Sequence, residues 1–407
     1  MMTKLTLNQL DVHHKKVLLR VDFNVPLESR GVISDDTRIQ AALPSIHSIL
    51  NRHGKLIIMS HLGRPKGQRD PSLSLAPCAT RLSELINSAV GFATDCIGQK
   101  TLDQVNQLLP GKALVLENLR FHPEEESPSR DNRFAADLAA LGEAYVNDAF
   151  GTAHRNHSSI VSITQFFKKA SAMGLLMEKE INMLSHLVTR PKSPFSLVLG
   201  GAKLSTKIGL LKTLLPKIHA LFIGGGMAFT FLKAQGIAIG DSICDETLLP
   251  QAEKLIAICR REKVLLYLPK DVVIGKKTQT QWKTQTVEVK EGIPAGWQGM
   301  DIGPKTVSQW KQPLLSSATI FWNGPMGVFE ISSFAAGTVA IATILSQADT
   351  TVIAGGGDSL AAIKRLQLDA NFTHLSTGGG ASLAYLEYGH LPGIDALSTA
   401  PSKKNPS

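Results

Sequence analysis

The feature that most limits what this chain can fold into is a repeated alternation of short apolar runs with longer stretches of helical periodicity. In the first half these runs are rich in Val, Ile and Leu and cover residues 17–25, 55–63, 112–121 and 144–151. The second half repeats the alternation, with runs that start near residues 195, 220, 264, 318, 351 and 373. Strands of this composition separated by helical stretches predict a parallel sheet covered on both faces. The sequence therefore predicts an α/β fold.

The length of 407 residues predicts about two domains, each with its own core. A helical segment over residues 173–188 leads into Thr189, Arg190, Pro191 and a stretch rich in Ser and Pro, which is the natural domain boundary. Residues 276–299 are rich in Thr, Gln and Lys and predict an exposed loop with a short strand. A disordered tail is expected from Ser398.

The formal net charge of +9 and the pI near 9.3 fit an anionic partner, either nucleic acid or a small phosphorylated molecule. The basic residues are spread along the chain and only 6% of residues are aromatic, so a stacking surface for single strands is poorly supported. The four cysteines form no CxxC pair and indicate neither a disulfide framework nor a zinc site. No apolar run is long enough to span a bilayer, and we expect a cytoplasmic protein.

In the first half, polar side chains gather where each apolar run ends, which is the edge at which open α/β sheets bind ligands. They are Asp22, Asn24, His61, Arg64, Arg120, His122, Asn147, Asp148, His154 and Arg155, joined by Arg38 at the start of a helix-like segment. Any single arginine is explained more simply by a helix cap or a local acid. Several at one edge instead favour a compact ligand with many negative charges, because guanidinium groups grip phosphate or carboxylate oxygens in pairs. The spacing of His154 and His157 lacks a third ligand, so no metal is predicted there.

In the second half, residues 195–207 (FSLVLGGAKLSTK) predict a strand, a glycine turn and a helix. Lys203 and Lys207 stand four apart in the expected first helical turn, where they either bind an anion or are two solvated lysines. Glycine triplets follow at 224–226, 355–357 and 378–380, and the second and third are expected to lead into helix N-termini that face phosphates. Neither standard nucleotide fingerprint is present. Asp358 would hold a hydrated Mg²⁺ or cap a helix, and the spacing does not choose.

Nine motifs in order resemble the phosphoglycerate kinase family, from about Leu7 to Leu397. They are RVDFNVP (20–26), SHLGRPKG (60–67), ENLRFHPEE (117–125), NDAFGTAHR (147–155), LGGAKLSTK (199–207), GGGMAFTFLK (224–233), WNGPMGVFE (322–330), GGGDS (355–359) and STGGGAS (376–382). The resemblance implies two doubly wound, Rossmann-like parallel-sheet domains that are joined by a helix and bend at a hinge. It implies domains over 1–172 and 191–382, a connecting helix over 173–190, a returning segment over 383–397 that packs on the N-terminal domain, and a tail over 398–407.

The resemblance also implies the reaction, which is reversible Mg²⁺-dependent transfer of the acyl phosphate of 1,3-bisphosphoglycerate to ADP, giving 3-phosphoglycerate and ATP. By the resemblance Arg38 and Lys203 are catalytic, and Mg²⁺ binds at Asp358. The implied phosphoglycerate site consists of Asp22, Phe23, Asn24, Arg38, His61, Leu62, Gly63, Arg64, Arg120 and Arg155. The implied nucleotide site consists of Lys207, Gly225, Glu330, Gly356, Gly357, Asp358 and Ser359. A monomer without nucleic-acid or membrane partners is implied as well.

Three departures from the family pattern stand out. Ser359 replaces a common Thr but keeps the hydroxyl, whereas Ala384 and residues 388–390 change the returning segment and bear on domain coupling. Glu180 and His374 match positions near the family's hinge, and their interaction is a hypothesis. The acceptor carboxylate is already ionised at neutral pH, so no general base is expected, and Asp22 more plausibly accepts from a substrate hydroxyl. Two alternatives remain: a kinase for another carboxylic acid, and a non-catalytic protein that binds nucleotide or nucleic acid with steep salt dependence.

Overall fold

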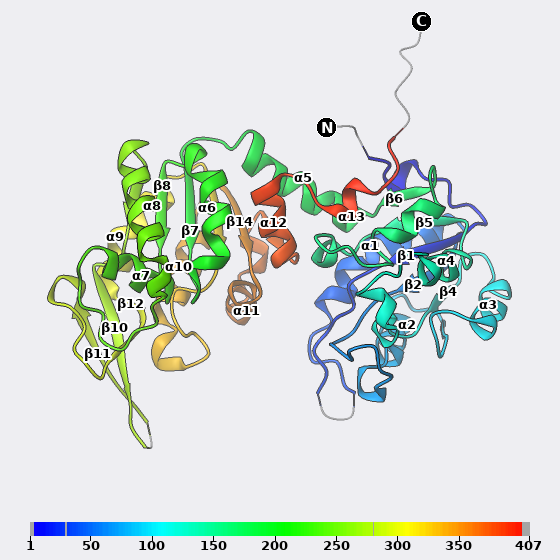
Figure 1. Ribbon diagram of the computed structural model, residues 1–407, viewed down its shortest axis with the longest axis horizontal. Helices are drawn as coiled ribbons and strands as arrows, with labels where there is room; N and C mark the ends of the chain where they lie inside the picture. The colour runs from blue at the N-terminus through cyan, green and yellow to red at the C-terminus, as the bar shows by residue number, and fades with distance from the viewer. Residues whose placement is uncertain (1–3, 29–30, 280, 401–407) are drawn as a thin grey trace, which may run out of the picture. The chain divides into compact units, whose positions relative to one another are not determined.

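The structure is a computed structural model that describes residues 4–28, 31–279 and 281–400. The chain forms two compact units (Figure 1). The first unit contains the chain up to Asn182 together with the residues from His390 on, and the second runs from Met183 to Gly389. The boundary at residues 182 and 183 falls inside one helix, α5 (Leu175–Thr189), which starts close to where the sequence predicted it.

The first unit is built on a six-stranded sheet in the order β3-β4-β2-β1-β5-β6, in which every pairing is parallel. Its strands are β1 (Lys16–Arg20), β2 (Lys55–Met59), β3 (Val90–Phe92), β4 (Ala113–Val115), β5 (Ala144–Asn147) and β6 (Ser171–Met173). The short outer strands β3 and β6 were not among the predicted runs, because three residues are too few to show a periodic pattern.

Helices α1 (Thr37–Asn51), α2 (Ala76–Leu85), α3 (Gln99–Asn106), α4 (Arg133–Ala139) and α13 (Pro392–Asp395) complete this unit. The spacing of apolar residues in α1 explains how it packs, since Ile39, Ala42, Ile46 and Ile49 recur every three or four positions and are all buried. They join a core that includes alternate residues of the central strands, such as Val17 and Leu19. The helix thus covers one face of the sheet and fixes the position of its own first turn.

The residues after 390 also belong to this unit through hydrogen bonds. Asn147 Nδ2 donates to the carbonyl of Gly393 at 3.1 Å, and Ser398 and Ser171 share a hydroxyl contact of 2.8 Å. Lys4 and Thr399 form an antiparallel bridge. Ser398, where the sequence suggested that a disordered tail begins, is therefore buried and bonded, while residues 401–407 of the expected tail lie outside the described residues.

The second unit contains a six-stranded parallel sheet in the order β15-β14-β13-β7-β8-β9. Its strands are β7 (Phe195–Leu199), β8 (Ala220–Ile223), β9 (Leu265–Tyr267), β13 (Thr319–Asn323), β14 (Thr351–Gly355) and β15 (His374–Ser376). Its helices are α6 (Ile208–Leu214), α7 (Met227–Ala234), α8 (Leu249–Arg261), α9 (Pro304–Leu315), α10 (Ala336–Ser346), α11 (Gly357–Arg365) and α12 (Gly380–Tyr388). Every residue of β7 and β13 is buried, as the predicted two-sided coverage requires.

A separate three-stranded antiparallel sheet also belongs to the second unit. It pairs β11 (Trp282–Glu288) with β10 (Asp271–Lys277) and β10 with β12 (Gln298–Ile302). In Figure 1 the hairpin of β10 and β11 projects away from the parallel strands. The prediction of an exposed loop with a short strand over 276–299, which rested on the alternating residues TVEVK, is confirmed in part. A strand is present as β11 and its residues 283–286 are exposed, but the ends of β10 and β12 also fall in this segment and pair in a sheet.

Both units are thus parallel α/β sheets, which confirms the predicted fold class. The predicted domain boundaries and the hinge stay predictions. Among the residues that the structure describes, no helix combines the length and the apolar character that crossing a membrane would require.

Candidate functional site

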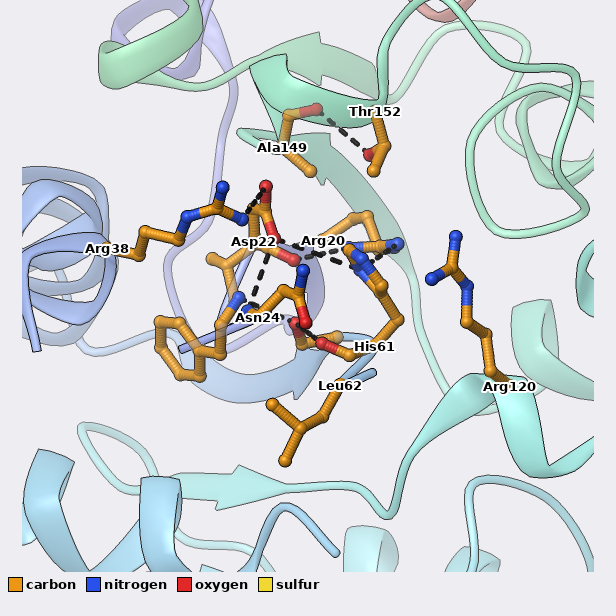
Figure 2. A network of polar contacts seen from close by, with 12 residues as sticks. Arg20, Asp22, Asn24, Arg38, His61, Leu62, Arg120, Ala149 and Thr152 are labelled. Atoms are coloured by element: carbon orange, nitrogen blue, oxygen red, sulfur yellow. Dashed lines mark hydrogen bonds and ion pairs between the residues drawn. The ribbon is translucent and has the colours of Figure 1, made fainter. Parts of the chain in front are cut away.

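The carboxyl ends of β1 and β2 carry the first group of site residues, which is centred on Asp22. One carboxylate oxygen of Asp22 pairs with Arg38 Nη1 at 2.7 Å, and the other lies 3.9 Å from His61 Nδ1. Figure 2 shows Asp22 between Arg38 on one side and Arg20 with His61 on the other. Arg38 reaches this position from the first turn of α1, and its side chain is 38% exposed. The guanidinium is therefore held by one acid and still open to a ligand.

The loops after β1 and β2 are locked to each other through their backbones. The N–H of Phe23 donates to Ser60 Oγ, and the N–H of Gly63 donates to Asn24 Oδ1, both at 2.8 Å. Gly63 has φ +62°, and a Cβ there would lie 2.6 Å from Leu73 Cδ2, so the turn requires glycine. This locking fixes where Asn24 and the loop around Gly63 stand.

His61 is buried against positively charged groups. Arg20 Nη2 lies 3.3 Å from its Nδ1, and burial together with Arg20, Arg120 and Arg38 holds the pKa of His61 well below its ordinary value. His61 is therefore neutral near pH 7 and can donate or accept a hydrogen bond without adding charge.

Arg120 enters from η3 (Leu119–Phe121), and in Figure 2 it lies on the opposite side of His61 from Arg38. Its Nη1 donates to the carbonyl of Gly63 at 2.8 Å and its Nη2 pairs with Glu126 at 2.9 Å. Its buried Nε has no hydrogen-bond partner within the described part of the chain. Burial, opposed by Glu126, lowers the pKa of Arg120. Its N–H groups are positioned by the loops that form the site.

The group of basic residues extends to Arg155 and to His157, which is neutral near pH 7. Burial, together with the charges of Arg20, Arg120 and Arg155, lowers the pKa of His157 to about 3. Of the predicted residues in this unit, Arg64 and Arg155 are exposed, and Phe23, Leu62, His61 and Arg120 are buried. The structure thus brings Asp22, Arg38, His61 and Arg120 to one sheet edge, and the charge of Arg155 acts on Arg120 and His157. Arg64 stands in the loop after β2.

One functional residue was missed by the sequence reasoning, namely Arg20. It is fully buried at the end of β1, where its Nε donates to Ser159 Oγ at 2.8 Å and its Nη2 lies 3.8 Å from Glu125 Oε1. Glu125 in turn accepts from the N–H and the hydroxyl of Ser159, at 2.9 and 2.6 Å. A charged residue inside the apolar run at 17–25 was the available signal, because such a residue is rarely buried without partners.

In the second unit, Lys207 and Asn323 lie at the carboxyl edge of the sheet. Lys207 Nζ donates to Asn323 Oδ1 at the end of β13, while Asn323 Nδ2 is buried and has no hydrogen-bond partner among the residues that the structure describes. Burial lowers the pKa of Lys207 to about 8, against the charge of Asp358, which raises it. This lysine is only 9% exposed and is thus a poor candidate for a solvated surface residue.

The segment that carries Lys203 and Lys207 differs from the prediction. Residues 204–207 form a short 3₁₀ turn, η7 (Leu204–Lys207), before α6 starts at Ile208. Lys203 is exposed whereas Lys207 is buried, so the two lysines do not share one face of a helical turn. A 3₁₀ turn has three residues per turn, which separates positions four apart.

The first glycine triplet packs on other loops of this unit. Gly225 has φ +63°, and a Cβ there would lie 2.5 Å from the backbone nitrogen of Gly201. The N–H of Gly201 donates to Pro325 O at 2.8 Å, and that of Gly225 donates to Met326 O at 3.0 Å. These contacts explain the glycine at 225 without a ligand.

The second and third triplets lead into α11 and α12, as predicted. A Cβ at Gly357 or Gly379 would meet no atom within 4 Å, so these turns face open space. The N-cap of α11 is Gly356, which means that Asp358 is not the cap and instead presents an exposed carboxylate in the first turn. Ser359 is fully buried and accepts from the N–H of Gly324 at 2.8 Å. Glu330 is exposed after β13.

Comparison with known proteins is consistent with this arrangement. The family model of phosphoglycerate kinase matches residues 7–389. The chain is 49% identical to the phosphoglycerate kinase of Chlorobium phaeovibrioides over 400 residues, 98% of this chain and all of the relative. It is 45% identical over 397 residues to that of Pseudothermotoga lettingae, covering 98% of this chain and 99% of the relative.

Two solved structures are also similar. The phosphoglycerate kinase of Coxiella burnetii has a TM-score of 0.85 at 36% identity, and that of Pyrococcus horikoshii has a TM-score of 0.82 at 30% identity. Each of these two matches covers 97% of this chain and 98% of the solved chain. The fold and the ligand-facing sheet edges define a kinase of the two-sheet α/β class. The chain belongs to the phosphoglycerate kinase family, which transfers a phosphoryl group between 1,3-bisphosphoglycerate and ADP.

Proposed function

We propose that the first unit binds the phosphoglycerate substrates through the group centred on Asp22, and that the second binds ADP or ATP near Lys207. The observation that carries the first half is the convergence of Arg20, Arg38, Arg120 and Arg155 near His61 and His157. Burial lowers the pKa of both histidines, and the charges of these arginines lower it as well. Glu125, Asp22 and Glu126 offset the charges of Arg20, Arg38 and Arg120 in part, and Arg155 adds a further positive charge beside neutral histidines. The site is therefore positive, and a compact polyanion would neutralise it.

Within this site the residues take different roles. Asp22 and Asn24 are acceptors for a substrate hydroxyl, and the exposed guanidinium groups of Arg64 and Arg155 suit phosphate oxygens. Arg120 is buried, and its Nε, which has no hydrogen-bond partner among the described residues, is a donor for a substrate oxygen. Phe23, Leu62 and Gly63 shape the backbone around the ligand rather than bind its charge.

In the second unit, the backbone at Gly356 and Gly357 opens α11, whose first N–H groups suit nucleotide phosphates. Lys207 adds a positive charge at the neighbouring strand end, and Glu330 is the proposed acceptor for the ribose hydroxyls. Gly225 and Ser359 act through the loops that they hold, since Gly225 packs on Gly201 and Ser359 bonds to Gly324.

Mg²⁺ fits this part of the site, because Asp358 offers an exposed carboxylate beside the proposed phosphate position, and this ion commonly binds one or two carboxylates together with phosphate oxygens. When bound, the ion would neutralise charge on the nucleotide phosphates. Asp358 is the residue that would hold it.

The chemistry requires charge neutralisation more than proton transfer. The acceptor is a carboxylate that is ionised at neutral pH, so no general base is needed, and positioning and electrostatics supply the rate. We propose Arg38 and Lys203, both with exposed cationic side chains, as the groups that neutralise the transferred phosphoryl group. We further propose that the protein is a cytoplasmic monomer.

A coupled assay tests these proposals. ADP formation from ATP should depend on 3-phosphoglycerate and stop when Mg²⁺ is chelated. Separate titrations should then show that Arg64→Ala weakens 3-phosphoglycerate binding without changing the dissociation constant for ADP, and that Lys207→Ala does the reverse. Equal loss of both ligands in either variant would contradict the assignment of ligands to units.

A further inference from the structure

A second group of potential ligand side chains lies in the first unit, outside the residues assigned to the substrates. Asp95, Cys96 and His122 each offer one atom, and these three atoms all lie within 4.8 Å of one another. Among the residues that the structure describes, no other set of three histidine, cysteine or acidic side chains meets this geometry.

The fold brings the three residues together from two loops. Asp95 and Cys96 follow β3, and His122 stands between η3 and η4 (Pro123–Glu125), after β4. Because β3 and β4 are parallel neighbours, their carboxyl ends meet at one edge of the sheet. His122 Nε2 lies 2.7 Å from Asp95 Oδ1, and the Asp95 loop is held by Thr101 Oγ1, which donates to the carbonyl of Asp95.

The three side chains also have the exposure that a metal site needs. Cys96 is fully buried, whereas the side chains of Asp95 and His122 are 44% and 25% exposed and give access from solvent. The His122 ring is held by stacking on Phe134, with centroids 5.2 Å apart. Cys96 is a free thiol without a disulfide partner.

We propose that Asp95, Cys96 and His122 bind one divalent transition-metal ion of the Zn²⁺ class. Sulfur, imidazole nitrogen and carboxylate oxygen are the donors that Zn²⁺ takes in proteins, and three protein ligands leave a fourth position for water. A thiolate ligand selects such ions over the hard Mg²⁺, which prefers oxygen donors alone. This site is distinct from the Mg²⁺ proposed for the second unit.

Binding of the metal ion would release the thiol proton of Cys96 and replace the contact between His122 and Asp95. The thiol proton of Cys96 leaves to solvent as the sulfur–metal bond forms. His122 binds through Nε2 with its ring proton on Nδ1, so the contact between His122 and Asp95 is given up and both atoms turn to the metal. Burial and the Asp95 charge raise the pKa of the Cys96 thiol, but a coordinated metal deprotonates a thiol outright.

Cobalt substitution provides the test on the full-length protein. Addition of Co²⁺ to the wild type should give the near-ultraviolet band of sulfur-to-cobalt charge transfer with one equivalent bound, and excess Mg²⁺ should not remove it. Cys96→Ser should lack the band. Cys259→Ser, which removes a buried cysteine in α8, and Cys244→Ser should keep it.

Two further variants keep the cysteine and guard against a folding defect in Cys96→Ser. Asp95→Asn and His122→Asn should each weaken Co²⁺ binding by more than about tenfold, since even outer-shell changes cost that much. Circular dichroism verifies that each variant is folded. The proposal is overturned if the folded wild type shows no band, if Cys96→Ser retains it, or if both ligand variants bind Co²⁺ as tightly as the wild type.

Discussion

The guanidinium of Arg38 is the residue-scale feature that matters most for the proposed transfer step. It is paired with Asp22 at 2.7 Å and yet 38% exposed, so it is oriented in advance and still able to meet a ligand. An oriented cation stabilises charge in the transition state without reorganising during the reaction. The neighbouring acid therefore aids Arg38 by holding it.

We expect Arg38→Ala to lower kcat by roughly 10² to 10⁵, the range known for cations that stabilise phosphoryl transfer, with a smaller effect on KM. Steady-state kinetics in the coupled assay measure this. Arg261→Ala is the matched control, because Arg261 is 73% exposed on α8 and pairs only with the adjacent Glu262 among the described ion pairs. An unchanged kcat in Arg38→Ala would remove Arg38 from the transition state.

Arg20 and Glu125 form a buried pair, so the loss of one partner should be more harmful than the loss of both. Arg20→Met should destabilise the protein by about 3 to 5 kcal/mol, because Glu125 is left buried without its cation. Arg20→Met combined with Glu125→Gln should recover part of that loss. Urea unfolding measures both variants, and a double variant no more stable than the single one would refute the pairing.

Lys207 should make nucleotide binding sensitive to pH. Its pKa in the free protein is about 8, and a bound phosphate favours the charged amine, so the pKa is higher in the complex. Below about pH 7 the lysine is charged in both states and contributes no slope. Above about pH 8 a proton must be taken up on binding, so affinity falls as pH rises.

Calorimetric titration of ADP from about pH 7.5 to about pH 9.5 tests this expectation. Lys207→Arg should flatten the profile, since arginine stays charged throughout the range. A wild-type profile that is flat over the same range would show that Lys207 does not contact the phosphates.

At the scale of elements, the glycine-rich turns of the second unit divide into two kinds. The turn at Gly225 is packed against backbone atoms of Gly201 and Pro325, whereas the turn that opens α11 at Gly357 meets no atom within 4 Å. One turn therefore serves packing and the other leaves room for a ligand. Substitution to alanine distinguishes the two.

Gly225→Ala should lower the free energy of unfolding by about 1 to 3 kcal/mol, because φ is positive and the new Cβ collides with backbone. Gly357→Ala should leave stability unchanged or raise it by up to about 1 kcal/mol, since alanine is the better helix former. It should instead weaken ADP binding at least about tenfold by filling the space for phosphate. Denaturant unfolding and ADP titration report both effects, and loss of stability in Gly357→Ala would contradict the distinction.

The sequence predicted the elements whose pattern is local and missed those that depend on neighbours. The central strands were recognised because their apolar runs are long. The pairing of β10 with β11 was not predicted because residues 283–286 are exposed. The 3₁₀ turn at 204–207 was predicted as the start of an α-helix because both conformations share the same apolar spacing at first. Short or half-exposed elements are specified by tertiary pairing rather than by their own composition.

At the scale of the whole molecule, the site residues divide into those that the sequence predicted and those that depend on partners far along the chain. Asp22, His61 and Arg120 were predictable because each follows a strand, and the ends of parallel strands meet at one edge. Arg20, Glu125, Asp95 and Cys96 were not, because their roles depend on partners far along the chain. His122 was predicted at the sheet edge, but its proximity to Asp95 and Cys96 was not. Spacing in the sequence carries no information about such contacts.

The predicted hinge is also a property of the whole molecule. Direct transfer requires that the two substrates meet and that water is excluded, which in kinases is achieved by closure around the ligands. We expect the radius of gyration from small-angle X-ray scattering to fall when 3-phosphoglycerate and a non-hydrolysable ATP analogue are both present. Either ligand alone is the control, and an unchanged radius with both would argue against hinge bending.

The hydrogen bonds that join Ser398 to Ser171 and Asn147 to Gly393 have a consequence for the order in which the protein can be assembled at the ribosome. The second unit is one uninterrupted stretch, residues 183–389, so its contacts need no residue from outside that stretch. The first unit is the earlier one to be synthesised, yet it has to wait for residues beyond 390 before its final contacts can form. The amino-terminal part of the chain therefore remains without these closing contacts until the last residues have been synthesised.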